Sequence, residues 1–350
     1  MTERQRATSR LATIAAATAP APAASDSAGL QASPTPSFWL ENAGTDPTAA
    51  APPPPVPPEA DFVVVGGGMT GVSTAYWLNK LGHSCVLLEG RGLAGGASGR
   101  NGGVLSGGSE FHMANIEMLK GIMEEQGGFD EFEYRLGGYL RIAFEGSDEA
   151  KEFRAMELGP SQQLWVGACL LPPSPPTVSP ASSPADEGLE ECGVRQDAER
   201  CAKELQTATV DGLKIDCGIF GEQSGHFWPA KVVHAIAAGA TDTTFCVGTN
   251  ALGMDPAEGE GVVVRTDRGD VKCKRVAICT NGWSPRLLPE LSEVLYPVRN
   301  GVIMTAPVKA WSWPGSVSIG DGPEEIYAQK RPVRRPSASD PCVPLTWAAG

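Results

Sequence analysis

The sequence predicts an α/β fold, and two observations within residues 61–103 carry that prediction. The first is a strand–helix–strand order over residues 61–88, with a glycine-rich turn between the first strand and the helix. The second is another cluster of glycines that follows this unit almost at once. Because strands that alternate with helices form a sheet covered by helices, we expect at least one domain of this layered kind.

The elements of this unit follow from local residue patterns. Asp61–Val65 is expected to be a short buried strand, since it is rich in β-branched residues and stops at glycine. Residues Met69–Leu81 have helical composition, and Gly82 is expected to end that helix before a second strand, Cys85–Leu88.

Three glycines with G-x-G-x-x-G spacing lie where the first strand turns into the helix: Gly66, Gly68 and Gly71. Glycine permits the tight turn, lets a pyrophosphate approach the backbone and brings the helix close to the strand. The diphosphate would sit at the positive helix N-terminus. Glu89 follows the second strand, where a carboxylate can bind an adenosine ribose and would repel the 2′-phosphate of NADP. A Rossmann-like dinucleotide site is therefore predicted, with a purely structural role of the glycines as the alternative.

The second glycine cluster, "GLAGGASGRNGG", favours a flavin over a nicotinamide cofactor, because a dinucleotide site needs only the first cluster. Its glycines at positions 95, 96, 99, 102 and 103 hold neither a helix nor an ordinary strand well. They suit a backbone that lies against a large flat ligand, with Ser98, Arg100 and Asn101 offering polar contacts. A flexible surface loop is the alternative.

Taken together, these motifs resemble a known family. The pattern "DFVVVGGGMTGVSTAYWL…VLLEGRGLAGGASGRNGG" is similar to FAD-dependent oxidoreductases of the D-amino-acid oxidase type, which include glycine and sarcosine oxidases and γ-glutamylputrescine oxidases. The resemblance is closest to the branch that carries G-R-N-G-G. Later segments also match: "GHFWPAKVVHAIAAGA", "VAICTNGWSPRLLPEL" and "LYPVRNGVIMTAP". Before the first strand, "SFWLENAG" resembles a short lead-in of this branch.

The resemblance implies a Rossmann-like FAD-binding domain, split in the sequence, and a second, mixed-sheet substrate domain. It implies that the FAD-binding domain covers 61–130 and 221–296 and that the substrate domain covers 131–220 and 297–330, followed by an irregular end over 331–350. Composition rich in Ala, Pro, Ser and Thr predicts a disordered tail and linker over 1–60, and a Pro/Ser-rich stretch predicts an insertion at 171–191 in the substrate domain. Family members continue well past a segment like "EEIYAQKRP", so we expect a truncated chain that binds FAD loosely. Four prolines after residue 331 are expected to forbid a continuous inner strand.

The resemblance also implies FAD as the cofactor and a small amine or amino acid as the substrate, whose C–N bond is oxidised by hydride transfer to flavin N5. Oxygen is the expected acceptor; no side chain is assigned as catalytic, and no metal site is expected. The predicted cofactor-binding residues are Gly66, Gly68, Met69, Thr70, Gly71, Glu89, Gly90, Arg91, Ala97, Ser98, Gly99, Arg100, Asn101, Gly102, Gly103, Thr280, Asn281 and Gly282. Two alternatives stay open: an NAD-dependent dehydrogenase and, because of the truncated end, a non-catalytic FAD-binding protein.

Composition narrows the possible partners. The formal net charge of -13 disfavours nucleic acid and anionic membranes. No apolar run reaches the roughly 18 to 20 residues of a membrane span. The nine cysteines contain no C-x-x-C pair, which indicates reduced thiols in an intracellular protein without a zinc site. A cytoplasmic location is predicted, and Arg4, Arg6 and Arg10 leave a mitochondrial or plastid transit peptide as the alternative.

Overall fold

The computed structural model describes residues 34–44, 46–48, 53–105, 110–156, 162–166, 209–210, 213–221, 224–297, 301–304, 308–309, 316–319, 326–330, 342–343 and 345–349. The chain divides into two compact units that each take two stretches of the sequence. We call them the first unit, Met1–Arg100 with Pro229–Arg299, and the second unit, Asn101–Trp228 with Asn300–Gly350. The fold is α/β, as predicted.

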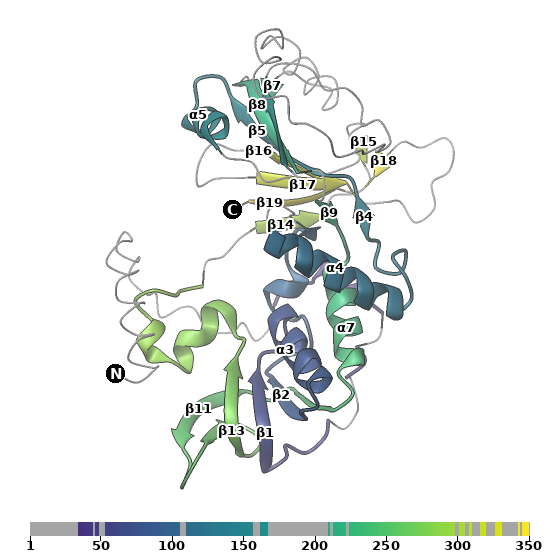
Figure 1. Cartoon of the computed structure of the whole chain (residues 1–350). Coiled ribbons are helices and arrows are strands. Elements are labelled where there is room, and N and C mark those ends of the chain that lie inside the picture. Colours follow the sequence, from purple (N-terminus) through teal and green to yellow (C-terminus); the bar gives the residue numbers. More distant parts are fainter. Residues whose placement is uncertain are drawn as a thin grey trace, which may run out of the picture. The chain divides into compact units, whose positions relative to one another are not determined.

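The first unit is built on a six-stranded sheet (Figure 1). Its strands lie in the order β10 (Thr243–Val247), β2 (Cys85–Glu89), β1 (Glu59–Val65), β13 (Val271–Ile278), β12 (Val262–Thr266) and β11 (Ala251–Pro256). The four strands from β10 to β13 are parallel, and β12 and β11 add an antiparallel edge. The predicted strands Asp61–Val65 and Cys85–Leu88 are confirmed as β1 and β2, and β12 and β13 form an antiparallel hairpin.

Two helices pack side by side in the first unit, α3 (Met69–Lys80) and α7 (Pro229–Gly239) (Figure 1). The predicted helix after the glycine turn is thus confirmed, and it ends where Gly82 adopts a φ of +83°, a conformation that favours glycine. Helix α3 also packs on β1 and β2, and Val72 and Ala75 on it are fully buried.

Both faces of the parallel strands are buried, which explains their uninterrupted apolar sequences. Val63 and Leu88 belong to a cluster on one face of the sheet. Val64 and Leu87 alternate with them, point to the opposite face and are fully buried as well. The β-branched run at the start of the sequence motif is therefore a requirement of a two-sided core.

The segment before β1 departs from the prediction of a disordered tail and linker. Residues 1–33 lie outside the described residues, but α2 (Phe38–Glu41) is a short helix that packs on α7. Its Trp39 is only 3% exposed. The Ala, Pro and Ser content of the first 60 residues favoured disorder, whereas the buried Trp39 and the contacts of α2 with α7 order this part of the segment.

A buried histidine on α7 makes the stability of the first unit dependent on pH. Neither ring nitrogen of His234 has a hydrogen-bond partner in the described part of the chain. Burial lowers the pKa of His234 below its usual value near 6.5, and the charge of Asp46 opposes this effect. As the pH falls, the unfolded chain therefore takes up a proton that the folded chain resists, and stability decreases in acid.

We expect the free energy of unfolding to fall below about pH 6.5, with a slope of at most about 1.4 kcal/mol per pH unit from this single proton. Urea unfolding between pH 5 and pH 8 measures it. His234→Phe, which keeps the ring volume without the proton, should flatten the profile. An equal slope in both proteins would show that other groups cause the acid sensitivity.

The second unit holds a mixed sheet of eight strands. Their order is β14 (Gly301–Met304), β19 (Leu345–Ala349), β17 (Ile326–Lys330), β16 (Ser316–Ile319), β5 (Tyr139–Phe144), β8 (Leu213–Gly221) and β6 (Gln162–Val166), with β7 (Thr209–Val210) paired to β8. Only β16 and β5 pair in parallel among these described strands. A mixed sheet in the second domain is as predicted.

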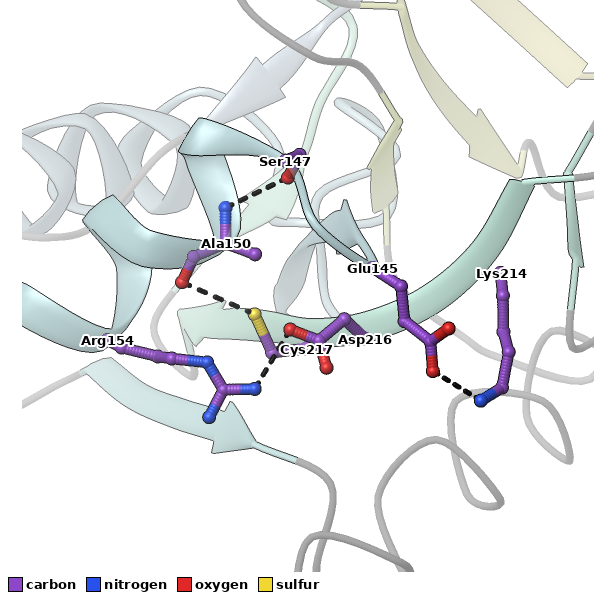
Figure 2. Close-up of polar contacts among 7 residues, drawn as sticks. All are labelled: Glu145, Ser147, Ala150, Arg154, Lys214, Asp216 and Cys217. Atoms are coloured by element: carbon purple, nitrogen blue, oxygen red, sulfur yellow. Dashed lines mark hydrogen bonds and ion pairs between the residues drawn. The ribbon is translucent and has the colours of Figure 1, made fainter.

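Helix α5 (Asp148–Ala155) packs on this sheet through an apolar cluster that includes Phe153 and Ile219. Figure 2 shows the polar contacts at the same place. Ser147 caps the helix by accepting a hydrogen bond from the Ala150 amide at 3.0 Å. Arg154 donates to Asp216 on β8 at 2.8 Å. Burial raises the pKa of the neighbouring Cys217 thiol to about 11, so this thiol is protonated at neutral pH. It donates to the Ala150 carbonyl at 3.9 Å.

The end of the chain departs from the prediction of an irregular segment over 331–350. Residues 331–341 lie outside the described residues, as does the predicted insertion at 171–191. Leu345–Ala349, however, forms the strand β19 between β14 and β17, and β18 (Cys342–Val343) pairs with β15 (Val308–Lys309). The prediction was wrong there because Pro344 is the last proline, so the five residues of β19 keep all their amide donors.

The remaining elements complete both units. In the second unit, β3 (Val104–Leu105), β9 (Gly225–His226) and β4 (Arg135–Leu136) form a three-stranded sheet, and α4 (Glu110–Glu125) follows β3. The short helices η1 (Ala97–Gly99), η2 (Asn281–Arg286) and η3 (Pro289–Leu291) belong to the first unit. No helix in the described ranges is both long and apolar enough to cross a membrane.

Candidate cofactor site

The carboxyl ends of three parallel strands meet at one edge of the first unit. Because β1, β2 and β13 run in the same direction, three residues at or just after their carboxyl ends come together: Gly66, Glu89 and Cys279. Backbone bonds fix this edge, with Gly66 donating to Leu88 at 2.8 Å and Cys279 donating to Val65 at 2.8 Å. The chain leaves β1 for β2 on one side and returns as β13 on the other. Ligands of open parallel sheets bind at such a position.

The three glycines of the first motif differ in what surrounds them. Gly66 has a φ of +110°, and a Cβ there would lie 2.5 Å from the Cys279 carbonyl oxygen. A Cβ on Gly71 would collide with the carbonyl of Gly66. A Cβ on Gly68 would meet only the Ser98 side chain, at 3.0 Å from its Oγ. Gly66 and Gly71 therefore serve the packing of the strand, turn and helix, while the space at Gly68 is bounded by a single hydroxyl group.

The N-terminus of α3 presents amide groups at this turn. The first amides of a helix have no partner within the helix, and their partial positive charge attracts anions. Ser98 Oγ accepts from the Met69 amide at 2.9 Å, so the second glycine cluster supplies a cap that Gly68 lacks. Thr70 is exposed, and its carbonyl accepts a hydrogen bond from Thr74 at 2.8 Å.

Glu89 holds the turn with its carboxylate. One oxygen accepts from the Gly67 amide at 2.7 Å, and the other accepts from the Arg91 amide at 2.8 Å. A carboxylate can accept about four hydrogen bonds. Each oxygen therefore keeps capacity for a further donor, such as a ribose hydroxyl. A Cβ on the following residue, Gly90, would collide with the side-chain oxygen of Asn250.

The second glycine cluster begins in the first unit with η1. Gly99 is buried, and Arg100 donates to the Gly95 carbonyl at 3.4 Å and to Thr35 at 3.1 Å. Burial lowers the pKa of the Arg100 guanidinium below its usual value, and the nearby positive charge of Arg91 lowers it further. The two guanidinium groups therefore place positive charge beside Gly95 and Gly96 of the second glycine cluster.

The last three residues of this cluster, Asn101, Gly102 and Gly103, belong to the second unit. The Gly103 amide donates to the Asn101 side chain at 2.8 Å, and the Gly103 carbonyl accepts from Phe227 at 3.1 Å. Gly103 has a φ of +73°. The chain then continues into β3, which pairs with β9 at His226.

The third predicted segment follows β13. Thr280 is the N-cap of η2 and shares a hydrogen bond of 3.0 Å with Ser284. Asn281 is exposed and has a φ of +49°. A Cβ on Gly282 would lie 2.8 Å from the Pro297 Cα, so this glycine is required by packing.

Sequence analysis missed three contributors to the site. Ala94 donates its amide to the Gly67 carbonyl at 2.9 Å and so joins the two glycine clusters. Asn250 lies against Gly90 and donates to Asp267 at 2.7 Å. The segment around α2 contacts Gly99. Ala94 lies in the second glycine cluster and α2 lies in "SFWLENAG", but neither motif indicates these contacts, and Asn250 lies in no motif. The contacts of Asn250 and α2 join segments far apart in the sequence.

These residues fit a dinucleotide with a diphosphate. Glu89 can accept from the ribose, the amides at the start of α3 and the space beside Gly68 suit the diphosphate, and Arg91 and Arg100 supply positive charge. Within the described residues, no group of three or more His, Cys, Asp and Glu side chains could hold a metal ion.

Comparison with known proteins agrees with this geometry. Residues 61–335 match the family model described as FAD dependent oxidoreductase. The chain is 26% identical over 271 residues to the probable oxidoreductase OrdL of Rhizobium meliloti (strain 1021), covering 75% of this chain and 59% of that protein. It is 27% identical over 254 residues to the gamma-glutamylputrescine oxidoreductase of Escherichia coli (strain K12), covering 70% of this chain and 54% of that protein.

The fold is similar to that of glycine oxidase from Geobacillus kaustophilus, with a TM-score of 0.59 and 18% identity over 84% of this chain and 73% of that one. The chain spans little more than half the length of the two curated relatives. Because the family match covers most of the sequence, from the first strand of the sheet to residue 335, the chain belongs to the family of FAD-dependent oxidoreductases.

Proposed function

We propose that this chain binds FAD and oxidises the C–N bond of a small amine or amino acid, with oxygen as the electron acceptor. The observation that carries the proposal is the arrangement of Glu89, Ser98 and the amides of the glycine turn at the carboxyl ends of β1 and β2. The similarity to a gamma-glutamylputrescine oxidoreductase supports an amine substrate, and the fold of glycine oxidase is compatible with an amino acid.

The residues of the first unit would bind and orient the cofactor. Bound FAD supplies the acceptor for a hydride from the carbon that bears the amine. Glu89 would hold the ribose, and the helix N-terminus at Met69 would stabilise the diphosphate charge. These contacts would anchor the adenosine diphosphate half of the cofactor and so hold its reactive ring within the site, where positioning contributes to the rate.

The experiment is to purify the chain, release and identify its bound cofactor, and measure oxygen consumption with a set of amines and amino acids. The released cofactor is expected to be FAD, with an absorbance band at about 450 nm, and oxygen uptake is expected to depend on the added substrate. Bound NAD would favour the alternative of a nicotinamide-dependent dehydrogenase. Bound FAD without turnover by any substrate, with oxygen or with an artificial electron acceptor, would favour a non-catalytic FAD-binding protein.

Glu89→Ala is expected to weaken FAD binding by about 1.5 to 3 kcal/mol, the range for hydrogen bonds to a charged group. Equilibrium titration of the apoprotein with FAD measures the change. The substitution also removes the acceptor of the Gly67 and Arg91 amides, so part of the loss comes from the turn itself.

Asp61→Ala is the matched control, because this carboxylate at the other end of β1 pairs with Lys274 at 2.7 Å and is exposed. FAD affinity should not change in that variant. If Glu89→Ala bound FAD as tightly as the unsubstituted chain, the ribose would have to be held elsewhere.

A further inference from the structure

The segment before β1 is tied to the second glycine cluster through a buried serine. Ser37 is 8% exposed, and its hydroxyl donates to the Gly99 carbonyl. The same oxygen caps α2 by accepting from the Leu40 amide at 3.3 Å. A buried hydroxyl group with both a donor and an acceptor role fixes the two segments relative to each other.

Apolar contact at the same place leaves little freedom for movement. A Cβ added to Gly99 would lie 3.2 Å from Leu40 Cγ, so α2 rests directly on η1. Trp39 is buried beside α7, which contacts both α2 and η1. Thus the three elements form one packed group, although they come from distant parts of the sequence.

The segment is also held at two further positions. Thr35 accepts a hydrogen bond from Arg100 at 3.1 Å, directly after η1. In the part of the segment that follows α2 in the sequence, the Pro54 carbonyl accepts a hydrogen bond from Arg268 at 2.9 Å. Arg268 is the first residue of the sequence Arg-Gly-Asp at the tip of the β12–β13 hairpin. Its side chain is engaged in this hydrogen bond within the fold.

Ser98 connects this group to the dinucleotide turn, because it lies next to Gly99 and accepts from the Met69 amide at 2.9 Å. A loop with glycines at 95, 96 and 99 loses much conformational entropy when it is ordered. A segment that orders the loop before the ligand arrives removes that cost from binding.

We propose that the segment Thr35–Leu40 is a positioning element for the cofactor site, with Ser37 as its positioning residue. It acts through Gly99 and Ser98 on the N-terminus of α3 and thereby sets the affinity for FAD. This inference rests on the proposed binding of FAD by the first unit. It predicts that a residue outside the family match at 61–335 controls cofactor affinity.

The test compares Ser37→Ala and Ser37→Thr in the full chain. Loss of the hydroxyl group should raise the dissociation constant for FAD about tenfold, the effect of one hydrogen bond to the backbone. Threonine keeps both hydrogen-bonding roles and should restore most of the affinity. Hydrogen exchange of the Met69 amide, measured without FAD, should be faster in Ser37→Ala than in the unsubstituted chain.

Ser147→Ala is the matched control, because Ser147 also caps a helix through its hydroxyl group but does so in the second unit (Figure 2). It should lower the unfolding temperature similarly and leave the FAD dissociation constant unchanged. If Ser37→Ala does not fold, Thr35→Val tests the exposed bond to Arg100, and the same rise in dissociation constant is expected.

Unchanged FAD affinity and Met69 exchange in the Ser37→Ala or Thr35→Val variant would overturn the inference. So would an equal loss of affinity in Ser147→Ala, which would indicate a general effect of stability. If the unsubstituted chain binds no FAD, the proposed function fails instead. Faster exchange of Met69 in Ser37→Ala would then still support the positioning role, and unchanged exchange would refute it.

Discussion

Gly68→Val is expected to abolish FAD binding while the chain stays folded, raising the dissociation constant by more than about a hundredfold. The backbone of Gly68 has a φ of -83°, which valine adopts easily, so the substitution strains no dihedral angle. Its Cβ would meet Ser98 Oγ at 3.0 Å. The branched side chain would therefore displace the serine that caps α3 and fill the space proposed for the diphosphate.

Flavin content and circular dichroism on the same preparation test this expectation. Gly92→Val is the control, because a Cβ there lies 3.9 Å from its nearest neighbour, Asp46 Oδ2, and the residue is exposed. This variant should keep its FAD. Normal flavin content in folded Gly68→Val would place the diphosphate elsewhere.

Gly71→Ala is expected to destabilise the first unit itself, by about 3 kcal/mol or more. The added methyl group would collide with the Gly66 carbonyl, and Gly66 is held by its amide hydrogen bond to Leu88 and lies against Cys279, so it has little room to move. Gly66 and Gly71 pack against each other, so relief of the collision requires α3 to leave the sheet. The loss should appear in the apoprotein, without any ligand.

Urea unfolding of the apoprotein measures this change. Gly121→Ala is a control in the middle of α4, where no atom lies within 4 Å of the new Cβ. That variant should be more stable by about 0.5 to 1 kcal/mol, the difference between glycine and alanine in a helix. A Gly71→Ala apoprotein as stable as the unsubstituted chain would contradict the close contact of helix and turn.

Gly68 and Gly71 are expected to have different roles, which the sequence motif alone does not distinguish. The sequence spacing predicted one site in which the three glycines provide the tight turn, the close approach of the pyrophosphate and the close packing of helix and strand. The elements β1, α3 and β2 could be predicted because their signals are local. The structure assigns Gly66 and Gly71 to packing against Cys279 and each other, and leaves Gly68 facing Ser98. That division depends on β13, which approaches from more than 200 residues further along the chain and leaves no signal near the motif.

The predictions for the first 60 and the last 20 residues failed for a similar physical reason. Composition made the first 60 residues resemble a disordered tail, although Trp39 docks part of them on α7. Proline content made the last 20 residues appear irregular, although Leu345–Ala349 follows the last proline and pairs on both sides. In both cases a few residues with strong tertiary contacts outweigh the average of their surroundings.

The pairing of β1 with β13 also has a consequence for synthesis of the chain. Glu59 pairs with Lys272, so the central strand of the first sheet has one unpaired edge until β13 has been made. At about 5 to 20 residues per second, the β1–β2 unit waits roughly 10 to 40 seconds for that partner. Contacts between such distant residues also slow folding itself. During this interval the edge of β1 that later pairs with β13 is open, and we expect this nascent strand to be a site where a chaperone binds.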